Sequence, residues 1–452
     1  MALVFYCQRT TSADTYGGSS ATVLASGSGT ATTSGTTCTV SGAADLTTLG
    51  ITNNVDTIRI ATETAGLNST DVFLITAHSA TTITVGVTFD GVSSQDWCIG
   101  GPWEKLQRPM DVVSAGDKVW VKADGLYTDD NGSSRHFENK QNGTTGAPIV
   151  FEGYKTTTGD IEDYYKANPA IRPSNSIYDY SSGTYCRPVI DAADSLARCL
   201  YTGAAGNHYY VFKHLHFKRA TAIAVDSPGH AITWKNCRFD NSPIGLSVST
   251  GLTEVAEGCS FTDCTNTALV AGIMMGVYNC DFGGNVIAVT AGNGVIVLYS
   301  TIHENTGDGI NCTTTSNYRI NVIVNNTIVG NNKESGKAAI RLKDDLQSVI
   351  ANNIIHNWAT GIEGETDQLE NLCVRNNLLA DNTADRSNFP AGGGDITACT
   401  DPLFVDEANG DLRLWPVSLA KIAGLPGDID IGAYQNDFTH PKKGGAWQYI
   451  DP

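Results

Sequence analysis

Residues 208–379 decide the fold, because one four-residue phrase recurs there: Asn236-Cys237-Arg238-Phe239, then Gly258-Cys259-Ser260-Phe261, then Asn279-Cys280-Asp281-Phe282. Five further copies of looser wording begin at His214, Tyr299, Asn325, Asn352 and Asn376. The large apolar residue that closes each phrase recurs every 20 to 27 residues. That spacing is the period of a solenoid, in which each repeat makes one turn of chain.

Short runs of β-branched and aromatic residues lie beside the phrases, for example Tyr209–Phe212, Val295–Leu298 and Ile320–Val324. They are too short for helices, and Gly, Asn, Asp or Ser separates them. One turn of chain per repeat lays each strand parallel to its copy in the next turn, about 4.8 Å away. The sequence therefore predicts an all-β chain built on a right-handed parallel β-helix solenoid.

Equivalent positions of the phrase should stack into columns along the solenoid. The fourth position gives an apolar core column: Phe217, Phe239, Phe261, Phe282, Ile302, Ile328, Ile355 and Leu379. The second position gives three thiols and then three amides: Cys237, Cys259, Cys280, Asn326, Asn353 and Asn377. We interpret the thiols as small core fillers and the asparagines as a ladder of side-chain hydrogen bonds. A zinc site is disfavoured because a fourth convergent ligand is missing, and we predict no metal and no cofactor.

Length, charge and cysteine content limit the classes of protein that fit. The chain has 452 residues, 12 cysteines and a net charge of -18. It is too long for one compact core, and its negative charge opposes binding to nucleic acid. The cysteines lack paired spacing, so we expect mostly free thiols and folding in a reducing cytoplasm. We expect no membrane span, because the longest apolar run, 268–278, is far shorter than about 20 residues, and residues 1–9 do not form a secretory signal.

Three regions follow from where the phrase occurs. Residues 1–97 lack it and predict a small antiparallel β domain, with strands at Thr57–Ile60, Val72–Thr76 and Thr82–Val85, the last two joined as a hairpin. Residues 98–435 form the solenoid, and residues 436–452 form a C-terminal tail. Within the solenoid, the long excursion at 155–185 is predicted to be a binding surface, since such loops usually carry contacts.

Two further segments carry a family resemblance. The opening coil at 115–127 and the closing motifs at 401–406, 410–414 and 428–435 resemble those of the pectate-lyase-like β-helix superfamily. The stretch DVFLITAHSATTITV at 71–85 resembles amino-terminal modules of bacteriophage structural proteins. A calcium site at 428–432 is disfavoured, because the bidentate glutamate of a calcium loop is missing.

Members of this superfamily that cleave polysaccharides imply lyase chemistry or hydrolysis between paired carboxylates. Two pairs of carboxylates could serve here. Glu304 and Asp308 closely follow the apolar residue of their phrase, and Asp344 and Asp345 follow a strand that contains Arg341. A solvated acidic face explains both pairs more simply. These four residues are therefore catalytic candidates only if the protein is an enzyme.

A solenoid without an export signal, joined to an added β domain, indicates a particle that is assembled in the host cytoplasm and later exposed. We predict a bacteriophage virion structural protein, either a capsid decoration or a tail-spike-like component on the particle surface. Residues 1–97 would attach to other virion proteins, the solenoid would project and bind polysaccharide, and a homotrimer is compatible with such a spike. The alternative is a polysaccharide lyase or glycoside hydrolase, and a third hypothesis is a bacterial surface adhesin.

Overall fold

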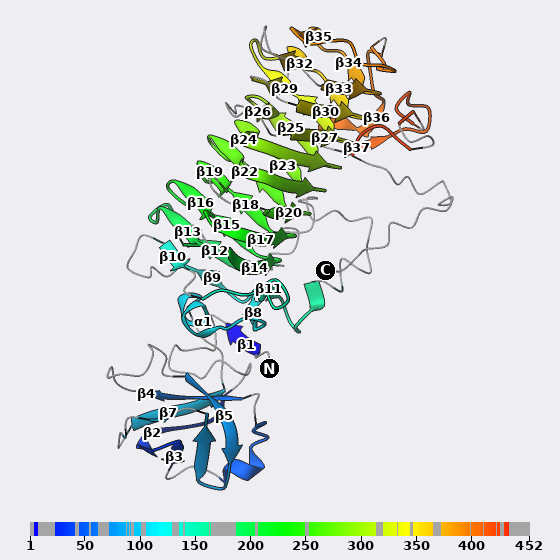
Figure 1. Cartoon of the computed structure of the whole chain (residues 1–452). Coiled ribbons are helices and arrows are strands. Elements are labelled where there is room, and N and C mark those ends of the chain that lie inside the picture. Colours follow the sequence, from blue (N-terminus) through cyan, green and yellow to red (C-terminus); the bar gives the residue numbers. More distant parts are fainter. Residues whose placement is uncertain are drawn as a thin grey trace.

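The chain is a rod of stacked strands with a small barrel at its N-terminal end (Figure 1). The computed structural model describes residues 4–7, 23–40, 45–53, 56–61, 72–86, 88–89, 91, 95–100, 105–128, 135–138, 141–161, 163, 187–203, 207–248, 253–312, 320–331, 333–343, 347–364, 372–397, 399–409, 411–421, 423–424 and 429–433. Within these ranges, no helix is long and apolar enough to cross a membrane.

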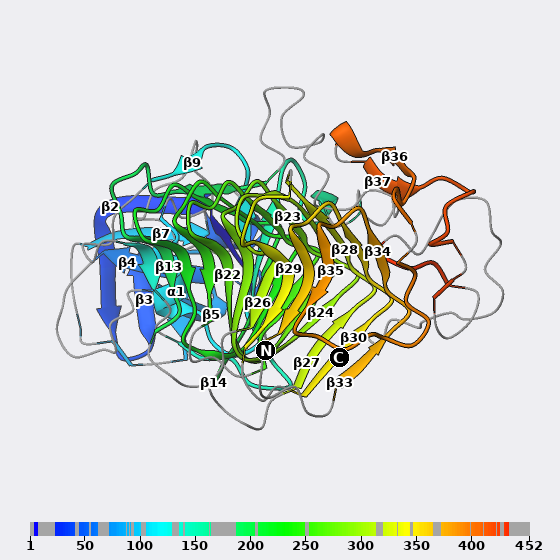
Figure 2. The ribbon, with the colours of Figure 1, turned by 90° about the horizontal axis from the view of Figure 1, so that it is seen from above.

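Three faces of parallel strands build the rod, and successive coils lie over one another when it is viewed from above (Figure 2). Face 1 contains β1 (Val4–Cys7), β8 (Lys118–Lys122), β11 (Ile149–Tyr154), β14 (Asn207–Lys213), β17 (His230–Lys235), β20 (Val255–Glu257), β22 (Thr267–Tyr278), β24 (Ile287–Leu298), β27 (Ile320–Val324), β30 (Gln347–Ala351) and β33 (Leu372–Arg375). Face 2 is a 10-stranded sheet of β9 (Leu126–Tyr127), β12 (Val189–Asp191), β15 (His216–Lys218), β18 (Arg238–Asp240), β21 (Ser260–Thr262), β23 (Asp281–Gly283), β25 (Thr301–Asn305), β28 (Thr327–Gly330), β31 (Ile354–His356) and β34 (Leu378–Ala380). Face 3 contains β10 (Arg135–Glu138), β13 (Arg198–Tyr201), β16 (Ile223–Asp226), β19 (Ile244–Ser247), the first halves of β22 and β24, β26 (Ile310–Cys312), β29 (Ala338–Leu342), β32 (Thr360–Gly364) and β35 (Ala384–Ser387). The predicted all-β parallel solenoid is confirmed.

The predicted core column is also confirmed. Its members pair in register from coil to coil along face 2 and are fully buried: Phe217, Phe239, Phe261, Phe282, Ile302, Ile328, Ile355 and Leu379. The four phenylalanine rings stack with successive centroids 5.6, 4.8 and 4.7 Å apart. Burying each such side chain stabilises the fold by about 1.5–3 kcal/mol, so this column holds the coils together.

Both columns at the second position exist as well. The three thiols are buried, and each donates to a carbonyl oxygen of a neighbouring coil, as Cys259 Sγ does to Trp234 O at 3.4 Å. The amide ladder runs from Asn326 Nδ2 to Asn353 Oδ1 and from Asn353 Nδ2 to Asn377 Oδ1, both at 3.0 Å. Asp395 ends it by accepting from Asn377 Nδ2 at 3.1 Å. The ten cysteines whose side chains are described are free thiols.

Left-handed backbone recurs at two fixed positions of these coils and bends the chain there. The first residue of each phrase has φ between 52° and 62°, from His214 to Asn376. In seven of the eight repeats a second left-handed residue follows five positions later, as Asn241 follows Asn236. Gly, Asn and Asp adopt this conformation at the lowest cost, whereas other residues lose about 1–2 kcal/mol. This explains why Asn opens five of the eight phrases.

The N-terminal domain is a closed antiparallel barrel with its own buried core. Its strands are β2 (Val23–Ser34), β3 (Thr37–Val40), β4 (Thr57–Ala61), β5 (Val72–His78), β6 (Thr82–Val85) and β7 (Gln95–Gly100). β5 and β6 pair as the predicted hairpin. We predicted that residues 1–97, and β1 with them, form this domain. Instead, β1 pairs in parallel with β8 and buries Phe5 and Cys7 in the solenoid core. The barrel is therefore inserted between the first two strands of face 1.

Helix α1 (Gln107–Val112) and its flanking residues bury Leu106, Met110 and Val113 in the solenoid core. At the other end, the described residues between 401 and 433 fold back over the outer side of face 2 and contain β36 (Phe404–Asp406), η2 (Glu407–Asn409) and β37 (Asp411–Leu414). The predicted tail 436–452 and residues 164–186, which form most of the predicted binding excursion, lie outside the described residues.

Candidate functional site

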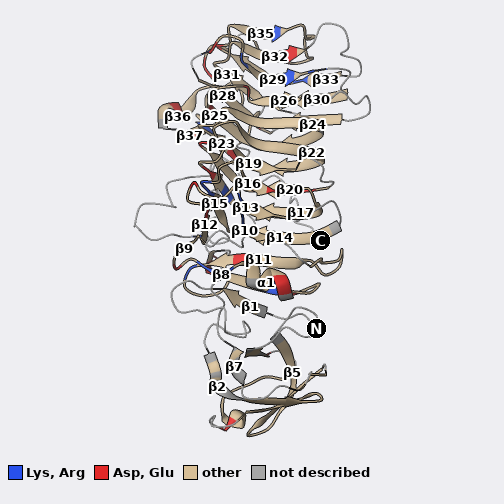
Figure 3. Cartoon of the chain, turned by 90° about the vertical axis from the view of Figure 1, so that its left-hand side faces the viewer, with Lys and Arg blue, Asp and Glu red and all other residues tan. Residues whose placement is uncertain are grey.

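The outer side of face 2 carries a set of interacting polar side chains that spans several coils. Because strand residues alternate, the residues on either side of the core column point outward. From β12 to β25 they form what we call the polar strip: Asp191, His216, Lys218, Arg238, Asp240, Ser260, Thr262, Asp281, Thr301 and His303, with Glu304 directly after. Figure 3 shows charges of both signs gathered around β12 and β15, whereas β22 and β24 contain no charged residue.

Ion pairs fix the lower part of the strip. Arg219 Nε lies 2.8 Å from Asp191 Oδ1, and Lys218 Nζ lies 3.6 Å from Asp191 Oδ2. His216 Nε2 and Arg238 Nε lie 2.8 and 3.1 Å from Asp240 Oδ2. Both aspartates are buried.

The ionisation of Asp240 follows from these contacts. Burial raises the pKa of Asp240, but the charges of His216, Arg238 and Lys218 outweigh it and hold that pKa below its ordinary value. Asp240 is therefore an anion at neutral pH, and its role is to hold its neighbours in place.

The upper part of the strip is a cluster around His303. Nε2 of His303 lies 3.2 Å from Asp281 Oδ1, and its Nδ1 lies 3.8 Å from Glu304 Oε2. Thr301 Oγ1 also donates to Asp281 Oδ1. The imidazole lies over Gly283, where an added Cβ would come within 2.8 Å of Cε1, so only glycine leaves room for it.

The His303 cluster is a proton-binding group with one open side. Burial lowers the pKa of His303, but Asp281 and Glu304 raise it more, so the net shift is upward. The side chain of Glu304 is 66% exposed, whereas those of His303 and Asp281 are 19% and 13% exposed. The cluster therefore offers solvent the carboxylate of Glu304, which can accept a hydrogen bond from a hydroxyl group, beside an imidazole whose Nε2 contacts Asp281 and whose Nδ1 is buried.

The structure places Glu304 and Asp308 in separate contact networks. Asp308 is held by Arg341, with Oδ2–Nε at 2.9 Å and Oδ1–Nη2 at 3.1 Å, and it accepts from the backbone of Ala338. Arg341 also pairs with Glu363 on face 3. Two parallel hydrogen bonds from the guanidinium of Arg341 fix the orientation of the Asp308 carboxylate. Asp344 and Asp345 lie outside the described residues, so the catalytic role of the four carboxylates stays a prediction.

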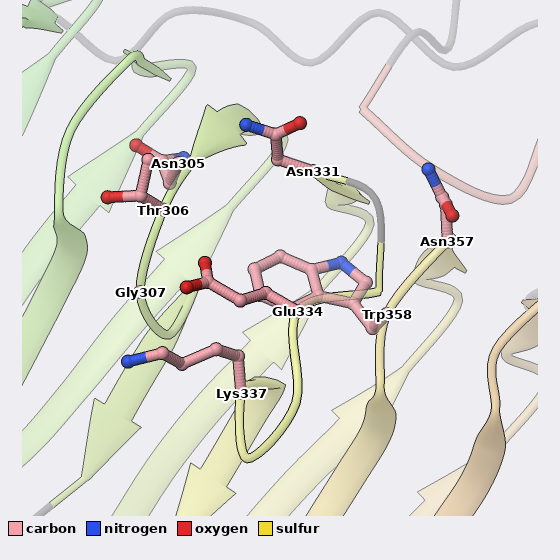
Figure 4. Close-up of a pocket in the computed structure, with 8 residues that line it drawn as sticks. All are labelled: Asn305, Thr306, Gly307, Asn331, Glu334, Lys337, Asn357 and Trp358. Atoms are coloured by element: carbon pink, nitrogen blue, oxygen red, sulfur yellow. The ribbon is translucent and has the colours of Figure 1, made fainter.

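A shallow hollow of about 160 Å³ adjoins the upper end of the strip (Figure 4). Three successive coils line it with Asn305, Thr306, Gly307, Asn331, Glu334, Lys337, Asn357 and Trp358. Glu334 and Lys337 lie along its open side, while Trp358 forms its buried floor and donates Nε1 to Ile328 O at 3.2 Å. Four of the eight lining residues carry amide or hydroxyl groups.

Asp281 and His303 were not predicted as site residues. Asp281 and Thr301 hold the third position of the phrase, where the residue type changes at almost every repeat, so the sequence pattern gives little signal there. Only their register across neighbouring coils brings Asp281, Thr301 and His303 together. Among the described residues, no three His, Cys, Asp or Glu side chains converge as metal ligands.

Comparisons with known proteins identify the fold. Residues 221–401 match the family model described as a right handed beta helix region. The crystal structure of pectate lyase Pel9A aligns with a TM-score of 0.54 and 14% identity, over 75% of this chain and 92% of that one. A tailspike protein mutant of E. coli bacteriophage HK620 aligns with a TM-score of 0.39 and 10% identity, over 63% and 53%.

The pectin methylesterase from Aspergillus niger aligns with a TM-score of 0.34 and 12% identity, over 72% and 91%. At these identities a likeness bears on the fold alone, and only the pectate lyase alignment exceeds a TM-score of 0.5 among the three structures. The comparison with curated proteins gave no significant match. The chain is thus a right-handed parallel β-helix protein with a pectate-lyase-like fold.

Proposed function

We propose that this chain is a structural protein of a bacteriophage particle, a capsid decoration or tail-spike-like component, whose β-helix binds polysaccharide along the polar strip. One observation carries the binding role. On the outer side of face 2, the upper coils bear apolar side chains that residues 401–433 cover, whereas the coils just below them bear the polar strip. The C-terminal segment reaches Thr327, where Ala433 N donates to Thr327 Oγ1 at 3.0 Å. It thus borders the coil that contains Thr301 and His303.

The chemistry of the strip suits a sugar chain. A polysaccharide presents hydroxyl groups, which donate and accept hydrogen bonds, at regular intervals. Strands about 4.8 Å apart present Thr262 and Asp281, which are partly exposed, as acceptors on neighbouring coils. Six other members of the strip are buried beside them: Asp191, His216, Arg238, Asp240, Ser260 and Thr301. Glu304 adds an exposed acceptor. Such a flat site gains affinity from several hydrogen bonds, some through water, rather than from one deep pocket.

The particle location is supported by the way the two parts of the chain are joined. The barrel is inserted between β1 and β8, so two chain crossings tie it to the solenoid at one end of the rod. We propose that this barrel attaches to other virion proteins and that the polar strip projects away from the particle. A homotrimer belongs to this proposal as its expected assembly. Imaging of the protein on an isolated particle, with a label on the barrel, tests the location and the subunit number together.

A catalytic role is the second candidate, and the Asp281–His303 pair is the observation that favours it. A carboxylate that orients an imidazole beside an exposed Glu304 is an arrangement that general acid–base catalysis uses. The protein would then be a polysaccharide lyase or glycoside hydrolase. Release of reducing sugar, or absorbance from an unsaturated product, would establish this candidate if Asp281→Asn abolished it.

The binding role is tested with a panel of soluble polysaccharides by affinity electrophoresis and calorimetry. The variant Asp281→Asn/Glu304→Gln should weaken binding of the selected glycan at least tenfold, because two charged hydrogen-bonding groups are lost. Glu363→Gln is the matched control, since Glu363 is a partly exposed carboxylate on face 3. Equal loss in both variants would place the binding surface elsewhere.

A further inference from the structure

We infer that the polar strip takes an uncharged, hydroxyl-rich polysaccharide, and not a polyuronate or another polyanion. This inference rests on the proposed binding role and names the ligand class of that site. It follows from the charges of the strip. An anionic chain requires cations that are free to pair with it, whereas the cations of the strip already contact carboxylates of the same chain.

The described cations of the strip are already paired with carboxylates of the same chain. Lys218 contacts Asp191, and Arg238 contacts Asp240. His216 shares Asp240 with Arg238, and His303 contacts Asp281. An anionic sugar would have to displace one of these internal partners, and the displaced carboxylate would remain buried beside it. The free energy lost by leaving a buried carboxylate unpaired exceeds the free energy gained from the new ion pair.

The charges that reach solvent at the edge of the strip are mainly carboxylates. The side chains of Asp194 and Glu304 are 70% and 66% exposed, and Asp263 is also exposed. Arg219 is the partly exposed cation there, but Asp191 and Asp194 both contact it. With the net charge of -18, the field around the strip repels a polyanion before contact.

A bridging divalent cation would not remove this obstacle. Such a cation needs several oxygen ligands that converge on one point. Within the described part of the chain, no three acidic, histidine or cysteine side chains are so placed. Asp191 and Asp240 are already engaged by basic side chains.

The composition of the adjoining hollow bears on the same preference for an uncharged ligand. Asn305, Asn331, Asn357 and Thr306 make up half of its lining, although both side-chain atoms of Asn305 are hydrogen-bonded within the chain. Its two charged members, Glu334 and Lys337, have opposite signs and add no net charge. Neutral hydroxyl groups can form hydrogen bonds with the amide and hydroxyl groups of this lining, and its one cation, Lys337, lies beside the carboxylate-bearing Glu334.

The test compares polysaccharides with their own carboxyl-reduced forms, so that each pair differs only where a carboxylate is replaced by an uncharged hydroxymethyl group. Polygalacturonate, alginate and hyaluronan, each beside its reduced form, are measured by affinity electrophoresis at 20 and 300 mM NaCl, with and without 2 mM Ca²⁺. We expect at least tenfold tighter binding of a reduced form, with less than a twofold change between the two salt concentrations. Tighter binding of an anionic form, with or without Ca²⁺, would overturn the inference and leave the binding role intact.

Failure of every polymer in both forms would instead count against the binding role itself. The variant Asp194→Asn/Asp263→Asn removes two negative charges that lie beside the strip but are not part of it. It therefore tests electrostatic repulsion separately from direct contact with the ligand. It should raise affinity for the anionic forms severalfold at 20 mM NaCl and leave the neutral forms within twofold. An unchanged preference in this variant would show that repulsion does not set the selectivity.

Discussion

The outer side of face 2 differs sharply between its lower coils, β12 to β25, and its upper coils, β28 to β34. Inside, both halves carry the same unbroken core column. Outside, the lower coils carry the polar strip, whereas the upper coils carry Val329, Ile354 and Leu378 beneath residues 401–433. Inward residues therefore specify the fold, and outward residues specify what each coil contacts.

The largest expected effect on stability comes from removing the C-terminal segment that covers the upper coils. Deletion of residues 401–452 removes Phe404, Leu412 and Leu414 from the apolar outer side of β28, β31 and β34. Each lost burial costs about 1.5–3 kcal/mol, so the upper coils should unfold first and bind the dye ANS. Deletion of 436–452 alone is the control and should change neither property. A truncated protein that unfolds like the full chain and binds no dye would show that the cover is not needed.

The next effect compares an inward residue with its outward neighbour. Phe261→Ala opens a cavity in the core column and should lower the free energy of unfolding by about 3–5 kcal/mol. Thr262→Ala removes an outward hydroxyl that accepts from Arg238 at 3.3 Å, and it should cost about 1 kcal/mol or less. Urea unfolding measures both variants. Similar losses would mean that the alternation of core and surface is misassigned.

A buried carboxyl should make the lower coils sensitive to pH. Glu254 is buried and contacts Ser227 Oγ at 2.7 Å and Trp234 Nε1 at 3.0 Å. Burial raises its pKa from 4.5 to about 8, although both hydrogen bonds lower it. The folded state thus keeps a proton that the unfolded state loses above pH 4.5, so the contribution of Glu254 to stability is complete below that pH and falls by a few kcal/mol towards pH 8.

Hydrogen exchange at Ser227 and Val255 between pH 5 and 9 follows this loss locally. Glu254→Gln keeps a neutral donor and acceptor and should flatten the pH profile. The neighbouring variant Glu257→Gln is the control and should retain it. A profile that is unchanged in Glu254→Gln would assign the sensitivity to another group.

The smallest effect concerns His303 in the polar strip. Its raised pKa means that the folded state binds the proton more tightly than the unfolded state does. This contribution is complete below about pH 6.5 and is lost as the pH rises through the folded pKa. At a partly exposed site it is about 1 kcal/mol or less. The difference in free energy of unfolding between the protein and His303→Gln should therefore shrink from pH 5.5 to 8.5. A difference that increased over that range would show that the folded state does not raise the pKa of His303.

The inward features could be predicted from the sequence because the same residue types recur at one spacing. The recurrence of phenylalanine at 239, 261 and 282 predicted the stacked rings. The recurrence of asparagine at 326, 353 and 377 predicted the ladder of side-chain hydrogen bonds. The left-handed bends also leave a trace, since they favour Asn, Asp and Gly.

The outward features could not be predicted in the same way. Asp281 meets His303 and Asp308 meets Arg341 across neighbouring coils, 22 and 33 residues away in the chain. Side chains on the outer surface differ from coil to coil, so no period marks these pairs. β1 was missed for a related reason: Val4–Cys7 joins face 1 without carrying the phrase.

A structure of the protein with the polysaccharide that it selects tests the central claim most directly. The account predicts density for sugar residues on the outer side of face 2, in contact with Asp281, His303 and Glu304 and next to Ala433. Sugar bound instead over Asn311, Arg341 and Glu363 on face 3 would contradict it.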